Sequence, residues 1–155
     1  MPAATRLKIE DPMQTLDPVE LKTISVQKEN IIHLPLGLLG FERIKKYVLL
    51  SEPDDAPFHW LQVLEDPSLA FLVLSPFEAM PDYAPDIDQD VVEFLKLKSS
   101  QDALVFNIVT LHANGRATIN LRGPIILNRY TLIGKQVVPI NAAAYSLQHP
   151  LPAVD

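Results

Sequence analysis

The chain contains no cysteine, and this absence removes several kinds of chemistry at once. None of its 155 residues can form a disulfide, act as a thiolate nucleophile or hold zinc through sulfur, and a reducing compartment fits such a chain. Long apolar runs are missing too. None approaches the roughly 20 residues that a membrane-spanning helix needs, and the N-terminus lacks the apolar segment of a signal peptide. We therefore expect a soluble cytoplasmic protein.

Glycine is scarce, with five residues against fourteen prolines. Proline cannot donate a backbone hydrogen bond to a sheet, so prolines between short apolar runs are typical of strand ends, turns and edges. Hydrophobic residues make up 48% of the chain, which is enough for one domain with a sizeable core. Frequent breaks between short apolar runs favour an all-β architecture.

Lysine and arginine are absent from Tyr47 to Leu95, a stretch that carries eleven carboxylates. Residues 1–46 hold six acids and seven bases, and residues 96–155 hold two acids and six bases, so the net charge of −6 arises in the middle third. A block of one sign repels phosphate and attracts a basic protein surface. The block therefore disfavours a nucleic-acid groove and leaves two interpretations open, a docking face for a cationic partner and a solvated, solubilising surface.

Short apolar or alternating runs predict about nine to ten strands and one short helix. We expect these strands to form a small closed or nearly closed β-barrel, because closure removes exposed strand edges. Residues 1–20 show no periodicity and are interpreted as a flexible N-terminal extension, with 21–155 as a single domain. The predicted strands are Thr23–Gln27, Asn30–Leu34, Lys46–Leu50, Phe58–Leu64, Leu69–Leu74, Ala103–Leu111, Ala117–Leu121, Pro124–Leu127 and Gln136–Ile140.

Asp86–Leu97 is the one segment with a convincing helical pattern. Asp90 is expected to cap the first turn, with Glu93 at the reciprocal position of a capping box. Part of the acidic block therefore has a structural explanation. The spacing Asp86-x-Asp88-x-Asp90 also resembles the start of a calcium loop, but the glycine and the bidentate glutamate that such a loop requires are absent.

Sequence motifs for catalysis or metal binding are lacking. The four histidines, His33, His59, His112 and His149, show no ligand spacing, and a site built from three of them would need the fold to gather them. No nucleophile elbow, P-loop or dinucleotide fingerprint occurs. We therefore expect no catalytic residues, no cofactor and no metal.

Four residues that are not acidic have two possible interpretations each. One of them, Trp60, lies within the acidic block, and the other three lie outside it. Trp60 could anchor a partner, although a lone tryptophan in an alternating strand is more often part of the core. Asn128, Lys135 and Gln136 are candidates for partner contacts in exposed loops, and turn chemistry explains them equally well.

Three segments in order resemble the FliW family of flagellar assembly factors. Gly37–Glu42 resembles the family's Gly-Leu-Pro-Gly-Phe-Glu, with Leu39 in place of the proline. Leu61–Phe71 resembles its Leu-Gln-Ser-x-Glu-x-Pro-x-Leu-Ala-Phe. Ala117–Asn128, followed by Gly134–Val138, resembles its Ala-Thr-x-Asn-Leu-x-x-Pro-Ile-x-Ile-Asn and Gly-Lys-Gln-Val. The resemblance spans about residues 22–152, and the first twenty residues have no counterpart in it.

The resemblance implies a small, β-barrel-like domain without enzymatic activity that binds two protein partners. One is flagellin, which the family binds in the cytoplasm before export. The other is CsrA, an RNA-binding repressor of flagellin translation, which the family binds and antagonises when free of flagellin. No direct contact with nucleic acid or membrane is implied, and a closed barrel would favour a monomer.

The acidic block and the resemblance together give a hypothesis for the partner surface. Acidic loops around Glu65, Asp66, Glu78 and Asp82 would face a cationic part of CsrA, and Trp60 and Gln62 would add specificity. The competing interpretation is a β-barrel enzyme or a metal-dependent small-molecule binder, since such folds often host these sites.

Overall fold

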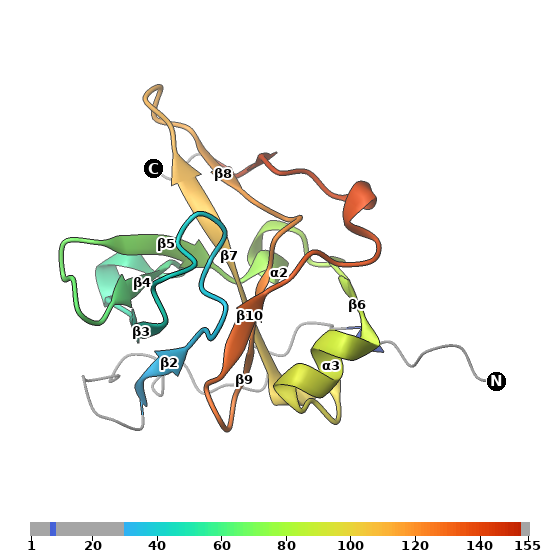
Figure 1. Ribbon diagram of the computed structural model, residues 1–155. Helices are drawn as coiled ribbons and strands as arrows, with labels where there is room; N and C mark the ends of the chain where they lie inside the picture. The colour runs from blue at the N-terminus through green and yellow to red at the C-terminus, as the bar shows by residue number, and fades with distance from the viewer. Residues whose placement is uncertain (1–6, 9–29, 153–155) are drawn as a thin grey trace.

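The computed structural model describes residues 7–8 and 30–152, which form eleven short strands and five short helical segments (Figure 1). Two of the sequence predictions, the strand Thr23–Gln27 and most of the extension 1–20, lie outside the described residues. The strands are β1 (Leu7–Lys8), β2 (Ile32–His33), β3 (Lys46–Leu50), β4 (His59–Val63), β5 (Ala70–Leu74), β6 (Asp86–Ile87), β7 (Ala103–Leu111), β8 (Ala117–Ile119), β9 (Ile125–Asn128), β10 (Gly134–Gln136) and β11 (His149–Pro150). The helices are α2 (Pro76–Ala79) and α3 (Gln89–Leu95), and the 3₁₀ segments are η3 (Pro53–Asp55), η4 (Ser100–Asp102) and η5 (Ala142–Ala144).

The main sheet is antiparallel but is not closed into a barrel. Its strands follow the order β10-β9-β7-β5-β4-β3-β2, while β8 pairs with β7 and β11 pairs with β8. The two ends of this path meet only at an isolated bridge between His33 and Ile133, where the His33 amide donates to the carbonyl of Leu132 at 2.9 Å. The prediction of a closed or nearly closed barrel is therefore wrong as to closure, whereas a mostly β, antiparallel architecture with short helices is confirmed. β2, which is two residues long, pairs with β3 and makes no ladder with β10.

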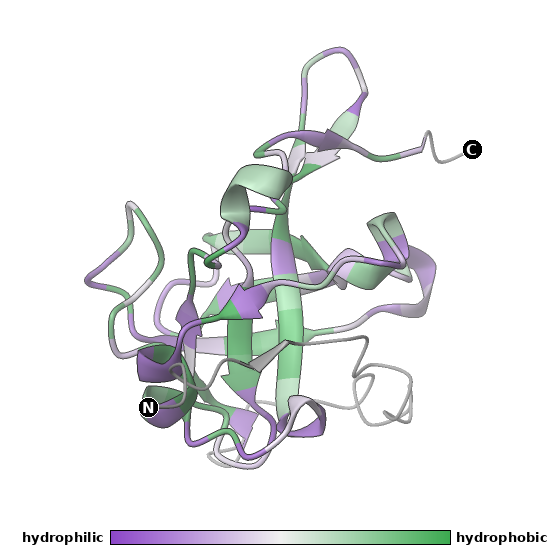
Figure 2. Ribbon diagram, turned by 90° about the vertical axis from the view of Figure 1, so that its right-hand side faces the viewer, coloured by the Kyte–Doolittle hydropathy of each residue, from purple (hydrophilic) through white to green (hydrophobic). Residues whose placement is uncertain are grey.

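β7 is the central strand and is buried on both faces from Ala103 to Val109, with only Ile108 half-buried in that span. Ala103, Val105 and Val109 point to one side, whereas Leu104 and Phe106 point to the other. β7 crosses the molecule (Figure 1), and it and the strands beside it consist largely of apolar residues (Figure 2). Side-chain alternation on this one strand therefore divides the interior into two cores.

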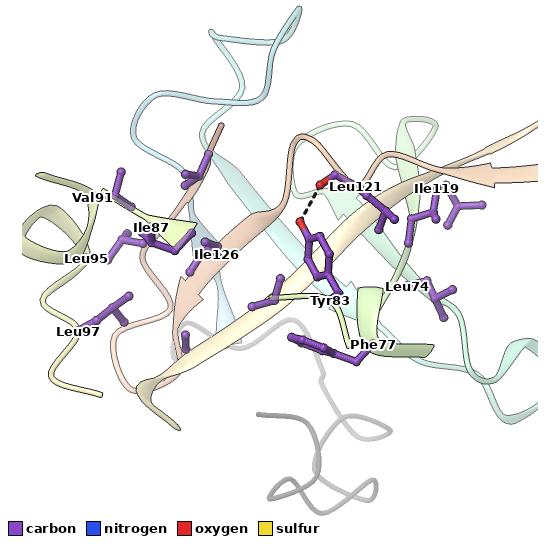
Figure 3. Packing of buried hydrophobic residues seen from close by; sticks show 14 residues of the cluster. Leu74, Phe77, Tyr83, Ile87, Val91, Leu95, Leu97, Ile119, Leu121 and Ile126 are labelled. Atoms are coloured by element: carbon purple, nitrogen blue, oxygen red, sulfur yellow. Dashed lines mark hydrogen bonds between the residues drawn. The ribbon is translucent and has the colours of Figure 1, made fainter. Parts of the chain in front are cut away.

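The first core lies between the sheet and the covering segments β6, α2 and α3. Its buried members are Leu74, Phe77, Tyr83, Ile87, Val91, Leu95, Leu97, Ala103, Val105, Val109, Ile119, Leu121, Ile126 and Val137. Figure 3 shows the Tyr83 hydroxyl directed at Leu121, to whose carbonyl it donates at 2.7 Å. Burial raises the pKa of Tyr83, so the hydroxyl keeps its proton and remains a donor at neutral pH.

The second core lies inside the curl of strands β2 to β5. Its buried members are Ile32, Leu34, Leu38, Tyr47, Leu49, Leu61, Val63, Val73, Leu104, Phe106, Ile125 and Leu127. Leu38 comes from the loop after β2 and is buried in this core, whereas Leu36 and Leu39 of the same loop are exposed, so packing explains only part of the loop's apolar composition. Phe41, from the same loop, packs edge-on against Phe71 with ring centroids 5.0 Å apart.

The predicted helix begins three residues later than expected, at Gln89 rather than at Asp86. Asp88, not Asp90, is the cap, and its side chain accepts a hydrogen bond from the Asp90 amide at 2.8 Å. Asp86–Ile87 instead pairs with Leu7–Lys8 as the strand β6. The prediction of Asp90 as the cap is therefore wrong, although a carboxylate cap at the start of this helix is confirmed.

Two further segments differ from the prediction. β10 occupies Gly134–Gln136, so it ends where the predicted strand Gln136–Ile140 was to begin. The pairing of Lys135 with Ile126 in β9 selects this register. Pro76–Ala79, which belongs to none of the predicted strands or to the predicted helix, forms a four-residue helix that starts at a proline, a favoured first position.

Gly134 offers a test of the packing between β10, β9 and the second core. A Cβ atom at this position would overlap the Leu127 side chain and lie 2.8 Å from the Ile126 carbonyl oxygen. We expect Gly134→Ala to lower the free energy of unfolding by about 1–3 kcal/mol through overpacking. Gly123→Ala is the matched control, because its Cβ would meet only side-chain atoms at 3.0 Å or more. Urea denaturation of both variants would contradict this account if Gly123→Ala proved the more costly.

His59 predicts a pH dependence of stability. Its ring packs edge-on against Phe106 at 5.6 Å, its Nδ1 lies 2.5 Å from the Ser51 hydroxyl, and burial lowers its pKa. The unfolded chain, with a histidine pKa of about 6.5, binds the proton more readily than the folded one. The stability from neutral His59 is therefore complete above the unfolded pKa and is lost as pH falls through the folded pKa.

The measurement is urea denaturation at about pH 7.5 and about pH 5.5. The wild-type chain should lose more unfolding free energy between these values than His59→Gln, which keeps a polar group but cannot titrate. Equal losses in the two proteins would show that other groups, such as the carboxylates, account for the whole effect.

Candidate partner-binding surface

β4 presents Trp60 and Gln62 on the face opposite to its core residues. Leu61 and Val63 point into the second core, and the period of two along a strand directs Trp60 and Gln62 to the other side. Both side chains are half-buried, so Trp60 is neither a fully buried core residue nor a fully exposed anchor. Its indole Nε1 donates to the Asp55 carboxylate at 3.3 Å.

Trp60 lines a groove with a cavity volume of about 720 Å³, which we call the Trp60 groove. The groove is bounded by β4, β5, the β7–β8 hairpin and the segment that follows β11. Its apolar side chains are Ala56, Phe58, Trp60, Leu72, Leu111, Ala117, Pro150, Leu151 and Pro152. Its charged side chains are Asp54, Asp55 and Arg116. Phe58, Leu72, Ala117 and Leu151 also pack against the first core, so the groove lies where that core opens to the surface.

Glu65 and Asp66 are exposed in the turn between β4 and β5. Asp66 has a structural role there, because its carboxylate accepts hydrogen bonds from the Ser68 amide at 3.1 Å and the Ser68 hydroxyl at 2.5 Å. The two acids share a hollow of about 370 Å³ with three basic side chains, Arg43, Lys45 and Lys46. The fold thus places bases from outside the acidic block beside it, and this part of the surface is mixed in charge.

Glu78 and Asp82 are exposed as well, but they lie elsewhere. Glu78 is in α2, which follows the C-terminal end of β5, whereas the Glu65–Asp66 turn precedes the N-terminal end of β5. Five strand residues separate the two positions, a span of about 16 Å at the usual rise. The acidic residues therefore do not form one compact cluster.

Asn128 is buried rather than exposed, so its assignment to an exposed loop is wrong. Only 4% of its surface is accessible. Its amide donates to the Leu95 carbonyl at 2.8 Å, and its oxygen accepts from the backbone of Tyr130 at 2.9 Å and Thr131 at 3.2 Å. The side chain thereby joins the end of α3 to the turn after β9, and this supports the turn-chemistry interpretation.

Lys135 and Gln136 also lie in a strand, β10, rather than in a loop, and both are half-buried. The Gln136 side chain accepts from the Leu39 amide at 2.9 Å and donates to the Gly123 carbonyl at 3.2 Å, so it ties the loop after β2 to the start of β9. The Lys135 ammonium lies 5.8 Å from the centroid of the Phe94 ring. These contacts explain both side chains by packing.

Neither histidine nor carboxylate groupings suggest a metal centre in the part of the chain that the structure describes. There, no three histidine or acidic side chains are placed to hold one ion. His112 instead shares a hydrogen bond of 2.8 Å with the Thr118 hydroxyl across the β7–β8 hairpin. Within residues 7–8 and 30–152, no helix has the length and apolarity to cross a membrane.

The Trp60 groove is the feature that the sequence did not reveal as a unit. Trp60 itself was singled out, but Leu111 and Arg116 belong to a hairpin more than fifty residues away in the chain. In the sequence, Leu111 stands only at the end of a long β-type run, and the structure shows that it is 66% exposed. Leu111 becomes informative only through its neighbours in the groove, because single exposed leucines are common on protein surfaces.

Comparison with known proteins places this geometry in a family. The FliW protein family matches residues 15–151. A flagellar assembly factor FliW from Caldicellulosiruptor bescii is 40% identical over 129 residues, which are 83% of this chain and 84% of that protein. One from Treponema denticola is 38% identical over 139 residues, which are 86% of this chain and 93% of that protein.

A solved structure agrees with the sequence relatives. The crystal structure of a flagellar assembly factor FliW superimposes with a TM-score of 0.72 at 30% identity, and the match covers 83% of this chain and 88% of that one. Proteins of this family are not enzymes, in agreement with the prediction that this chain has no catalytic activity. By sequence over most of its length and by fold, the chain belongs to the FliW protein family.

Proposed function

We propose that this chain is a non-enzymatic flagellar assembly factor that binds flagellin in the cytoplasm before export. When free of flagellin, it binds CsrA, the repressor of flagellin translation, and thereby relieves the repression. The observation that carries the proposal is the family match over residues 15–151, together with relatives that are themselves flagellar assembly factors. Flagellin synthesis would then follow flagellin export through one exchange of partners.

The charge of the chain supports a basic protein partner. An RNA-binding repressor carries a cationic surface that contacts phosphates, and a net charge of −6 attracts it. Glu65 and Asp66 remain our candidates for the CsrA contact, with Glu78 and Asp82 as a second exposed acidic site. Arg43, Lys45 and Lys46 beside Glu65 would restrict which basic surfaces fit, because a partner must avoid these three cations.

The remaining predicted residues divide by their surroundings. Trp60 and Gln62 stay candidates for partner contact, since both are half-exposed on one face of β4. Lys135, Gln136 and the buried Asn128 are better explained as residues that hold the fold, because each makes the specific contacts described above.

Glu65→Lys tests the proposed CsrA contact. It is preferable to a double change with Asp66, whose carboxylate also holds its own turn. We expect affinity for CsrA to fall by roughly fivefold at low salt, because an exposed ion pair contributes up to about 1 kcal/mol. The difference from wild type should shrink as salt rises. Isothermal calorimetry at two ionic strengths measures both effects.

Glu93→Lys is the matched control, because Glu93 is exposed on α3 and its substitution changes the net charge by the same amount. Unchanged CsrA affinity in Glu65→Lys at low salt would remove the turn from the interface. Equal losses in the two variants would mean that net charge, and not this turn, is recognised. Co-purification from motile cells, followed by addition of flagellin, shows whether the two partners displace each other.

A further inference from the structure

We propose that the Trp60 groove is a docking site for an extended peptide segment of a partner protein, with apolar side chains in its middle and a lysine or arginine at one end. This goes beyond the proposed function, because the groove lies at the other end of β4 from the Glu65–Asp66 turn. About 16 Å of strand separates the two sites. The two sites are therefore separate features of the surface.

The apolar floor of the groove is the first argument. Leu111 is 66% exposed at the end of β7, opposite Leu72 and the half-buried ring of Trp60. These side chains continue the first core outward. Apolar surface of this kind, enclosed on several sides, gains free energy when a complementary side chain covers it.

The backbone around the groove is the second argument, and it points to an extended occupant. β5 and β7 pair only at Val73–Ile108 and Leu74–Asn107. Beyond this point β7 continues to Leu111 and pairs with β8, whereas β5 from Ala70 to Leu72 pairs with β4. The sheet therefore splits, and the facing edges of β5 and β7 diverge at the groove. Strand edges without a partner strand recognise extended peptides.

The charges at the rim are the third argument, and they define the polarity of the occupant. Asp54 and Asp55 stand on one side, in a stretch from Tyr47 to Leu95 without lysine or arginine. Arg116 stands on the hairpin side. A basic residue at the Asp54–Asp55 end is favoured there by charge complementarity, and a carboxylate or carbonyl group suits the Arg116 end.

Trp60 supplies the measurement, because it is the only tryptophan of the chain. The probe is a short synthetic peptide without tryptophan that has lysines at one end, alternating leucine and serine in the middle and a glutamate at the other end. It is made in both orders and in a version with glutamate in place of every lysine. Titration into the full-length wild-type chain should give a saturable change in Trp60 fluorescence with at least one lysine peptide.

Two variants locate the binding. Leu111→Ser should weaken binding by about tenfold through loss of apolar contact, and Asp54→Lys by about fivefold through the reversed rim charge. Both residues are exposed, so the fold should tolerate the changes. Leu147→Ser and Asp82→Lys are the matched controls, since both residues are exposed and neither lines the groove. The controls should bind as the wild type does.

The outcomes separate the proposal from its alternatives. A saturable signal that Leu111→Ser weakens and Leu147→Ser does not supports the groove. The proposal is overturned if no peptide gives a saturable signal, if the all-glutamate peptide binds as tightly as the lysine peptides, or if an apolar dye binds at Trp60 and no peptide displaces it. Neither flagellin nor CsrA is present in these titrations, so their result is independent of the Glu65→Lys experiment.

Discussion

The rest of the structure depends on β7 being buried on both faces. A strand of nine residues with Ala103, Val105 and Val109 on one side and Leu104 and Phe106 on the other needs a hydrophobic cover for each face. The curled strands β2 to β5 cover one face, and β6, α2 and α3 cover the other. The strands β2 to β5 pair with one another in register, and only β5 of them pairs with the central strand. Loss of apolar volume on β7 would therefore weaken two cores at once.

The same strand also creates the surface on which we place partner binding. β7 pairs with β9 along its first half and with β8 along its second, while β5 pairs with it at only two residue positions. A strand that changes partners in this way cannot keep all its neighbours in register, so the sheet splits where β5 ends its pairing. The Trp60 groove is the consequence of that split, and Leu111 is exposed because β7 extends past the region that β5 covers.

Local pattern was enough to predict much of the fold. The bounds of Lys46–Leu50 and Ala103–Leu111 are as predicted, because apolar runs between polar breaks depend on neighbouring residues alone. The site was less accessible. The residue types of Asn128 and Gln136 do not distinguish them from polar residues in exposed loops. Only their hydrogen bonds with Leu95, Leu39 and Gly123 show that they connect separate segments of the fold. The prediction of barrel closure was wrong for the same reason, because closure depends on whether two short strands that are distant in the sequence pair with each other.

The acidic block shows how one sequence feature can divide into separate physical roles. Asp88 caps a helix, Asp66 holds a turn and Asp55 accepts a hydrogen bond from Trp60, so three of its carboxylates stabilise local structure. The fold then distributes the exposed remainder over both ends of β4 and β5. Two acidic sites about 16 Å apart can each meet a different basic segment. The exchange of partners that we propose would gain from such an arrangement, because a second partner could begin to bind before the first has left.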